Sequence, residues 1–157
     1  MYKSFIPCPA LETLDEIIEN YQLLNKDLKI YEQSITNEEI LLAIPQEQLR
    51  QVLIIILDNA IKYSGDNKEI IICSNVVNDK CNIKIQDNGY GISGEDLPYI
   101  FDRFYRVDKA RNRENGGSGL GLAIAKEIIE VFKGTIRVES ELGKGTVISL
   151  IIPYDPS

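Results

Sequence analysis

Residues 87–92, DNGYGI, carry the strongest structural signal in this chain. They follow KCNIKIQ at 80–86, where every second side chain is apolar, as in a strand with one face in the core. Asp87 falls on the apolar parity, so we expect a carboxylate on the core side, which is costly unless it is paired or hydrogen-bonded. A nucleobase amine would satisfy it, and Gly89 and Gly91 would let the backbone pass close to a flat ligand. The alternative is a strand-ending turn whose glycines only supply positive φ.

Hydrophobic periodicity predicts helices and strands in mixed order along the rest of the chain. The segment 88–117 lacks a regular pattern, and irregular loops of that length are usually functional lids or disordered. Val131 is expected on the buried side of the last helix, with Gly134 as its cap. The predicted fold is α+β, a two-layer sandwich in which a mixed sheet is covered on one face by three helices. The expected helices span 10–24, 45–64 and 119–132, and the expected strands span 29–35, 40–44, 69–77, 80–87, 135–140 and 145–153.

The composition is that of one globular domain. The chain has 157 residues, and we expect a lead-in at 1–9, one domain at 10–154 and a tail at 155–157. The net charge of −7 opposes nonspecific binding to nucleic acid and to anionic lipid, so neither is expected as a partner. Three cysteines without CxxC spacing argue against a disulfide framework and against zinc, and suit a reducing cytosol. The longest strongly apolar run, Val52–Leu57, is far too short to cross a bilayer, so no direct membrane contact is expected.

A second polar group lies on the predicted second helix. In LDNAIKYS, residues 57–64, Asn59 lies off the apolar stripe, and Lys62 and Tyr63 follow three and four residues later, so all three can face one site. An amide oxygen suits Mg²⁺, which takes few protein ligands and keeps waters and phosphate oxygens. Lys62 suits a phosphate, and Tyr63 suits the flank of a base. The alternative is an ordinary solvated polar face.

Two further motifs lie in or beside the irregular segment. GGSGLGLA at 116–123 has glycines at alternate positions where a helix starts, and exposed amides there suit a polyphosphate. No GK[ST] follows, as a Walker motif requires, and no parallel βαβ unit frames it, as a Rossmann fingerprint requires. A flexible loop is the alternative. FDRFYR at 101–106 supplies aromatic residues of the kind that anchor a lid to the core.

In their order along the chain, LDNAIKYS, DNGYGI, FDRFYR and GGSGLGLA resemble the motifs of the ATP-binding catalytic domain of a bacterial sensor histidine kinase, a Bergerat-fold ATPase. The resemblance covers residues 10–153, and FDRFYR is its most discriminating element because the other ATPase branches lack it. It implies that Asp87 binds the adenine amino group, that Asn59 binds Mg²⁺ and that Arg106 contacts phosphate as the catalytic arginine. The phenylalanines would hold down an ATP lid, and Thr146 would help to fix Asp87. The implied ATP-binding residues are Asn59, Lys62, Tyr63, Asp87, Gly89, Gly91, Ile92, Phe104, Arg106, Gly117, Ser118, Gly119, Leu120, Gly121 and Thr146.

The chain contains no histidine, so the phosphoryl acceptor of such a kinase must lie elsewhere. The implied reaction is transfer of the ATP γ-phosphoryl group to a histidine on a separate dimerisation domain of the same kinase, with a response regulator as the further partner. Positioning and charge stabilisation do most of the work in such transfers. We expect a fragment from the cytoplasmic part of a membrane-bound sensor, since Met1 leads almost directly into the first helix.

Ile55 departs from the family pattern. One turn before Asn59, many relatives carry a second polar residue, and the gyrase and chaperone ATPases carry a glutamate that activates water. Ile55 can neither bind a metal nor act as a base, which argues against an ATP-hydrolysing machine. Two alternatives remain open. One is a serine kinase of the anti-sigma-factor type, which FDRFYR argues against; the other is a nucleotide-gated binding module without transfer activity, which Ile55 keeps open.

Overall fold

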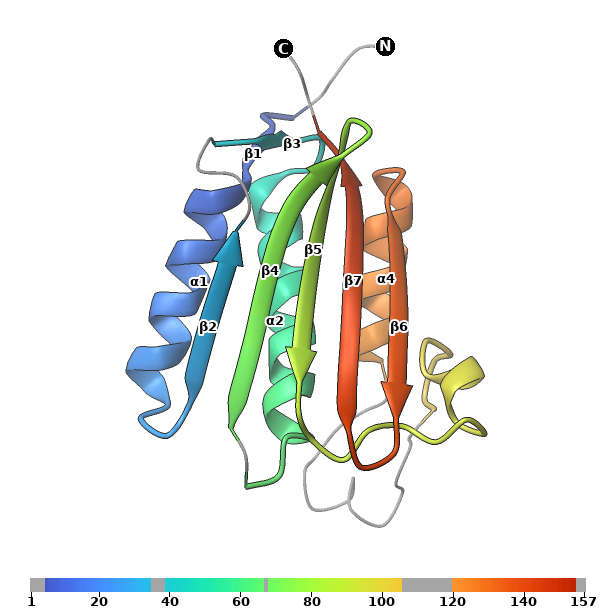
Figure 1. Cartoon of the computed structure of the whole chain (residues 1–157). Helices are drawn as coiled ribbons and strands as arrows, with labels where there is room; N and C mark the ends of the chain where they lie inside the picture. The colour runs from blue at the N-terminus through green and yellow to red at the C-terminus, as the bar shows by residue number, and fades with distance from the viewer. Residues whose placement is uncertain (1–4, 35–38, 67, 106–119, 155–157) are drawn as a thin grey trace.

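A five-stranded mixed sheet forms one layer of the molecule (Figure 1). The computed structural model describes residues 5–34, 39–66, 68–105 and 120–154, and its strand order is β2-β4-β5-β7-β6. β2 runs parallel to β4, and the other neighbouring strands run antiparallel. The strands are β2 (Lys29–Ser34), β4 (Glu69–Val77), β5 (Lys80–Asp87), β6 (Thr135–Glu141) and β7 (Gly145–Pro153).

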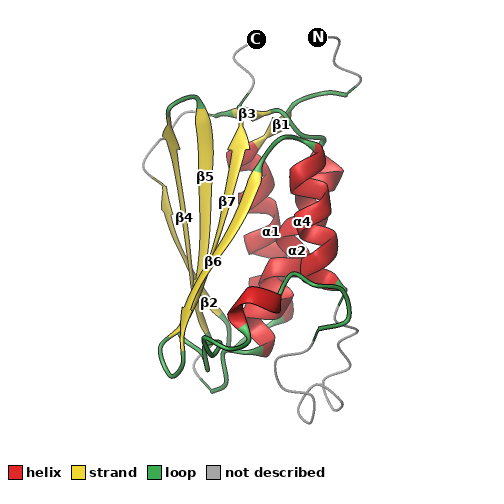
Figure 2. Ribbon diagram, turned by 90° about the vertical axis from the view of Figure 1, so that its right-hand side faces the viewer, coloured by secondary structure: helices red, strands yellow, loops and turns green. Residues whose placement is uncertain are grey.

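Three α-helices of the described residues lie on one face of this sheet (Figure 2). They are α1 (Ala10–Leu24), α2 (Gln46–Lys62) and α4 (Gly121–Val131). α2 lies between the other two and turns a buried stripe toward the sheet, as its helical spacing predicts. The predicted two-layer α+β sandwich is therefore confirmed. No helix in the described ranges combines the length and the apolar character needed to span a bilayer.

The strand expected at 40–44 is shorter than predicted and belongs to a second sheet. β3 (Leu41–Leu42) pairs antiparallel with β1 (Cys8–Pro9), a strand that the sequence did not predict. Leu42 also bridges Tyr154, just after β7. This small sheet ties the chain ahead of α1 to the end of β7.

The end of α4 differs from expectation at two residues. Val131 is 71% exposed because it lies two residues after the buried Ile129, about 200° around the helix axis. The N–H groups of Lys133 and Gly134 bond carbonyls of the last turn at 3.0 and 2.8 Å, which is a Schellman ending. The residue with positive φ is Lys133, at 65°, and not Gly134. Gly134 has a different steric role, since a Cβ there would lie 2.7 Å from the carbonyl oxygen of Ile151.

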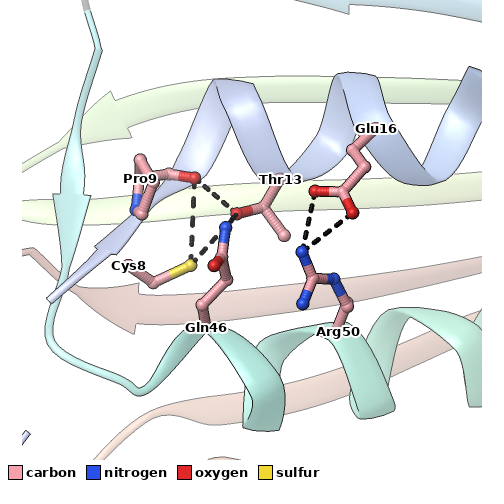
Figure 3. A network of polar contacts seen from close by, with 6 residues as sticks. All are labelled: Cys8, Pro9, Thr13, Glu16, Gln46 and Arg50. Carbon is pink, nitrogen blue, oxygen red and sulfur yellow. Dashed lines mark hydrogen bonds and ion pairs between the residues drawn. The ribbon is translucent and has the colours of Figure 1, made fainter. Parts of the chain in front are cut away.

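A buried polar network joins β1, α1 and α2 (Figure 3). The hydroxyl of Thr13, which is fully buried, donates to the carbonyl oxygen of Pro9 at 2.6 Å and accepts the side-chain N–H of Gln46 at 3.0 Å. The sulfur of Cys8 lies 3.3 Å from the same hydroxyl oxygen, and burial raises the pKa of this thiol. One threonine therefore satisfies the polar groups of three elements.

Thr13→Val preserves the side-chain shape and removes the hydroxyl. Gln46 and Cys8 then lose a partner in a buried site, so the free energy of unfolding should fall by about 1–3 kcal/mol. Glu16→Gln is the control, because the ion pair of Glu16 with Arg50 bridges the same two helices at 2.7 Å but is partly exposed. Its expected cost is below about 1 kcal/mol. Urea unfolding at neutral pH measures both variants, and equal losses would contradict this role of Thr13.

Candidate functional site

Asp87 ends β5, and its carboxylate lies against the core, as the strand parity predicts. The residue is 6% exposed. Its Oδ1 accepts the N–H of Gly89 at 2.9 Å, and the backbone N–H of Thr146, its cross-strand partner on β7, also bonds the carboxylate. Burial raises the pKa of Asp87, and the two N–H donors oppose that rise. No cation pairs with it among the described residues, where its hydrogen-bond partners are these two N–H donors.

Glycines around Asp87 let backbone segments touch. A Cβ on Gly89 would lie 1.9 Å from the carbonyl oxygen of Tyr63, at the end of α2. A Cβ on Gly91 would lie 2.1 Å from the carbonyl oxygen of the last residue of β6, and one on Gly145 would lie 2.1 Å from that of Asp87. The protein's own backbone therefore excludes a Cβ at Gly89 and Gly91, and the close approach of a flat ligand there stays a prediction.

Ser140 on β6 joins the loop after β5 to the β6–β7 hairpin. Its Oγ accepts the N–H of Ile92 at 2.8 Å and donates to the carbonyl oxygen of Gly145 at 2.9 Å. It also lies 2.7 Å from Oγ1 of Thr146. The sequence analysis identified Ile92 and Thr146 but missed Ser140. Its place on the inward parity of the last-but-one strand, opposite Thr146, is the signal that would have found it.

The end of α2 approaches Asp87 from the helix layer. Asn59 is half-buried in the last turns of α2, and Nζ of Lys62 lies 5.4 Å from the centre of the Tyr63 ring. The carbonyl oxygen of Tyr63 accepts the N–H of Tyr90 at 3.0 Å, which ties the helix end to the loop after Asp87. The three predicted residues of this helix are thus gathered at one end of it. Across the described ranges, no cluster of three or more acidic, cysteine or histidine side chains could hold a metal ion.

Ile55 lies one turn before Asn59 and faces the start of α4. It is half-buried, and its Cγ2 lies 3.3 Å from the position of a Cβ on Gly121, the first residue of α4. Leu120, which precedes α4, and Gly121 are therefore next to α2. The other predicted phosphate-binding residues lie outside the described residues; they are Arg106, Gly117, Ser118 and Gly119.

Asp96 organises the segment that leads into FDRFYR. It accepts the hydroxyl of Ser93 at 2.8 Å and the hydroxyl of Tyr105, around the single 3₁₀ turn η1 (Leu97–Tyr99). The hydrogen bond from Tyr105, and to a smaller extent that from Ser93, lowers the pKa of Asp96. These bonds close the segment on itself.

The two phenylalanines of FDRFYR behave differently. Phe101 is half-buried against the core, and Nζ of Lys126 on α4 lies 5.6 Å from the centre of its ring. Phe104 is 71% exposed with φ of 67°, so the expectation that it anchors the lid to the core is wrong. The next residue, Tyr105, turns back and donates its hydroxyl to Asp96.

Comparisons with known proteins agree on the kind of fold. Residues 45–156 match the family described as histidine kinase-, DNA gyrase B- and HSP90-like ATPase. The signal transduction histidine-protein kinase ArlS of Staphylococcus haemolyticus is 41% identical over 140 residues, which cover 89% of this chain and 31% of that protein. This chain thus spans 31% of the length of that relative.

Solved structures of similar extent superpose closely. The mycobacterial sensor histidine kinase MprB has a TM-score of 0.79 at 25% identity, covering 96% of this chain and 98% of that one. A nucleotide-free catalytic domain of the histidine kinase ThkA has a TM-score of 0.78 at 25% identity, covering 96% and 95%.

The buried Asp87 predicts an unusual dependence of stability on pH. Its pKa is raised in the folded state, so the folded chain binds more protons, and the free energy of unfolding decreases as the pH rises from 3.8, the ordinary value, through the folded pKa. Asp87→Asn removes this decrease and keeps an oxygen for the N–H of Gly89. We therefore expect the ligand-free variant to gain stability relative to the wild type between acidic and neutral pH. Urea unfolding across that range tests it, with the exposed Asp79→Asn as control; a stability difference between Asp87→Asn and the wild type that does not change with pH would contradict it.

Proposed function

Because this chain belongs to the histidine kinase-, DNA gyrase B- and HSP90-like ATPase family, we propose that it binds Mg-ATP and donates the γ-phosphoryl group to a histidine on a separate dimerisation domain. Its relatives are named histidine kinases, which supports the kinase branch of the family over the others. Residues 10–154 form the catalytic domain in this proposal. The anti-sigma-type serine kinase and the binding module without transfer remain as outcomes of the test below.

The observation that carries the proposal is the buried carboxylate of Asp87. It accepts two backbone N–H groups and still has lone pairs to offer, with no cation beside it in the described ranges. A carboxylate accepts hydrogen bonds at about four lone-pair positions, so two remain for a donor from outside. The exocyclic amine of adenine is such a donor. Tyr63 and Ile92 lie on the segments that flank this carboxylate and are assigned to the base.

The phosphate end of the site is assigned to the ends of α2 and α4. Asn59 is the proposed Mg²⁺ ligand. Ile55, one turn earlier, offers no ligand atom, but Mg²⁺ takes few protein ligands, so a single one at this helix end suits it. When bound, Mg²⁺ neutralises phosphate charge. Lys62 is assigned to phosphate. Leu120 and Gly121 open α4, whose N-terminal amides suit a polyphosphate. The remaining residues of the proposed ATP site are Gly89, Gly91, Phe104, Arg106, Gly117, Ser118, Gly119 and Thr146.

The proposed protein partners are a dimerisation domain that carries the acceptor histidine and a response regulator. It has no histidine to accept a phosphoryl group, and Ile55 packs against α4 at the position where a base would activate water. The acceptor is therefore assigned to the dimerisation domain of the same kinase, and the phosphoryl group passes on to a response regulator. ATP supply implies a cytoplasmic setting.

Asp87→Asn should weaken ATP binding, because a charge-assisted hydrogen bond to the adenine amine is lost. The expected loss is about 1.5–3 kcal/mol, or roughly ten- to a hundredfold in Kd. GTP should bind poorly to the wild type, since its base presents a carbonyl where adenine presents an amine. Asp79→Asn, at the opposite end of β5, is the matched control and should bind ATP normally. Calorimetry that finds equal ATP and GTP affinity would remove Asp87 from the base site.

Transfer is tested with labelled ATP, Mg²⁺ and a histidine-bearing dimerisation domain of this kinase class. The chain alone should form no acid-labile phosphohistidine and should hydrolyse ATP slowly. With the partner in trans, label should appear on the partner's histidine, at a low rate because a tether normally supplies a high effective concentration. Label on a serine would favour the anti-sigma type, fast hydrolysis would favour the ATPase branches, and binding without any label would favour the binding module.

A further inference from the structure

Three polar side chains form a row across the end of the sheet. Asp87 on β5 is paired with Thr146 on β7, and Thr146 is paired with Ser140 on β6. Directly paired residues of antiparallel strands project to the same face, about 4.5–5.5 Å apart at Cβ. The two hydroxyls therefore continue the line of the buried carboxylate.

The hydrogen bonds of Ser140 fix the direction of this row. A hydroxyl has one proton and can accept two further bonds. Ser140 Oγ accepts the N–H of Ile92 at 2.8 Å and lies 2.9 Å from the carbonyl oxygen of Gly145, which can only accept. Ser140 must therefore give its proton to Gly145, so the contact of 2.7 Å with Thr146 Oγ1 is satisfied only if Thr146 donates. All three contacts of Ser140 are then satisfied at once.

This arrangement commits both protons of Thr146. Its backbone N–H bonds the Asp87 carboxylate, and its hydroxyl proton points to Ser140. With that proton committed, Thr146 Oγ1 has only lone pairs left to offer, and it lies on the residue paired with Asp87, whose carboxylate also offers lone pairs. A group that donates hydrogen bonds fits this pair of acceptors, and a carbonyl group is repelled by it.

We propose that Ser140 is a specificity-determining positioning residue, which holds the Thr146 hydroxyl as an acceptor so that the site selects a purine with a 6-amino group over one with a 6-carbonyl group. This inference rests on the proposed function and deepens it. Without Ser140 the Thr146 hydroxyl can turn and donate, and a carbonyl then finds a partner. Ser140 itself touches no ligand and acts through Thr146.

The test compares ATP with inosine triphosphate, which differs at the purine 6-position and the adjoining ring nitrogen and has the same ribose and phosphates. Contacts to metal and phosphate therefore cancel in the ratio of the two affinities. By calorimetry, Ser140→Ala should lower the preference for ATP by about two- to tenfold, the range of one neutral hydrogen bond. Ser140→Thr keeps the hydroxyl and should keep the preference. Thermal unfolding checks that each variant is folded.

A double-mutant cycle separates this role from a structural one. Thr146→Val should lose the same part of the preference, and adding Ser140→Ala to it should change the ratio no further. An equal loss of affinity for both nucleotides in Ser140→Ala, or an unchanged ratio, would overturn the role of Ser140 while leaving ATP binding in place. Failure of the wild type to bind ATP would overturn the proposed function itself. If Ser140→Ala does not fold, a Thr146→Val protein that retains the full preference overturns the inference.

Discussion

The carboxylate of Asp87 is buried, and no cation among the described residues pairs with it. A buried charge needs donors, and here they are two backbone N–H groups, from Gly89 and Thr146. Gly89, one of these donors, and Gly145, the residue before the other, both lie in close backbone contacts. A Cβ would come 1.9 Å from a carbonyl oxygen at Gly89 and 2.1 Å from one at Gly145. The end of α2, the loop after β5 and the β6–β7 hairpin meet around this carboxylate.

The sequence alone predicts a helix or strand correctly where the spacing of that element's own side chains determines its secondary structure. The alternation in residues 80–87 located β5 and put Asp87 on the buried side, and helical spacing located α1 and α2 to within a residue or two. The sequence pattern does not predict a feature that depends on a contact with a residue elsewhere in the chain. β3 pairs with β1, and Tyr105 bonds Asp96 nine residues earlier; no local hydrophobic pattern contains either contact.

The candidate site shows the same division. Helical spacing singled out Asn59, strand parity singled out Asp87, and the family resemblance added Thr146. The contacts of the glycines and of Ser140 appear only when the strands are paired. A glycine in a motif indicates that a Cβ does not fit at that position, but it does not indicate which atoms, of a ligand or of the protein, exclude it. At Gly89 and Gly91 the excluding atoms belong to the chain itself. Ser140 gains its importance from Thr146 opposite it, a relation that exists only across two strands.

The small sheet of β1 and β3 lies at the end of the domain opposite Asp87, beside Pro153, which pairs with Lys80 at the far end of β5 (Figure 1). Any chain that precedes β1 therefore joins the domain at one pole, while the carboxylate lies at the other, about 25 Å away along the eight residues of β5. A tilt of about 10° at the junction with that chain sweeps the Asp87 end through about 4 Å, since the arm is one strand long. A small change of angle at the junction is thus enough to bring the far pole into contact with a neighbouring group or to withdraw it.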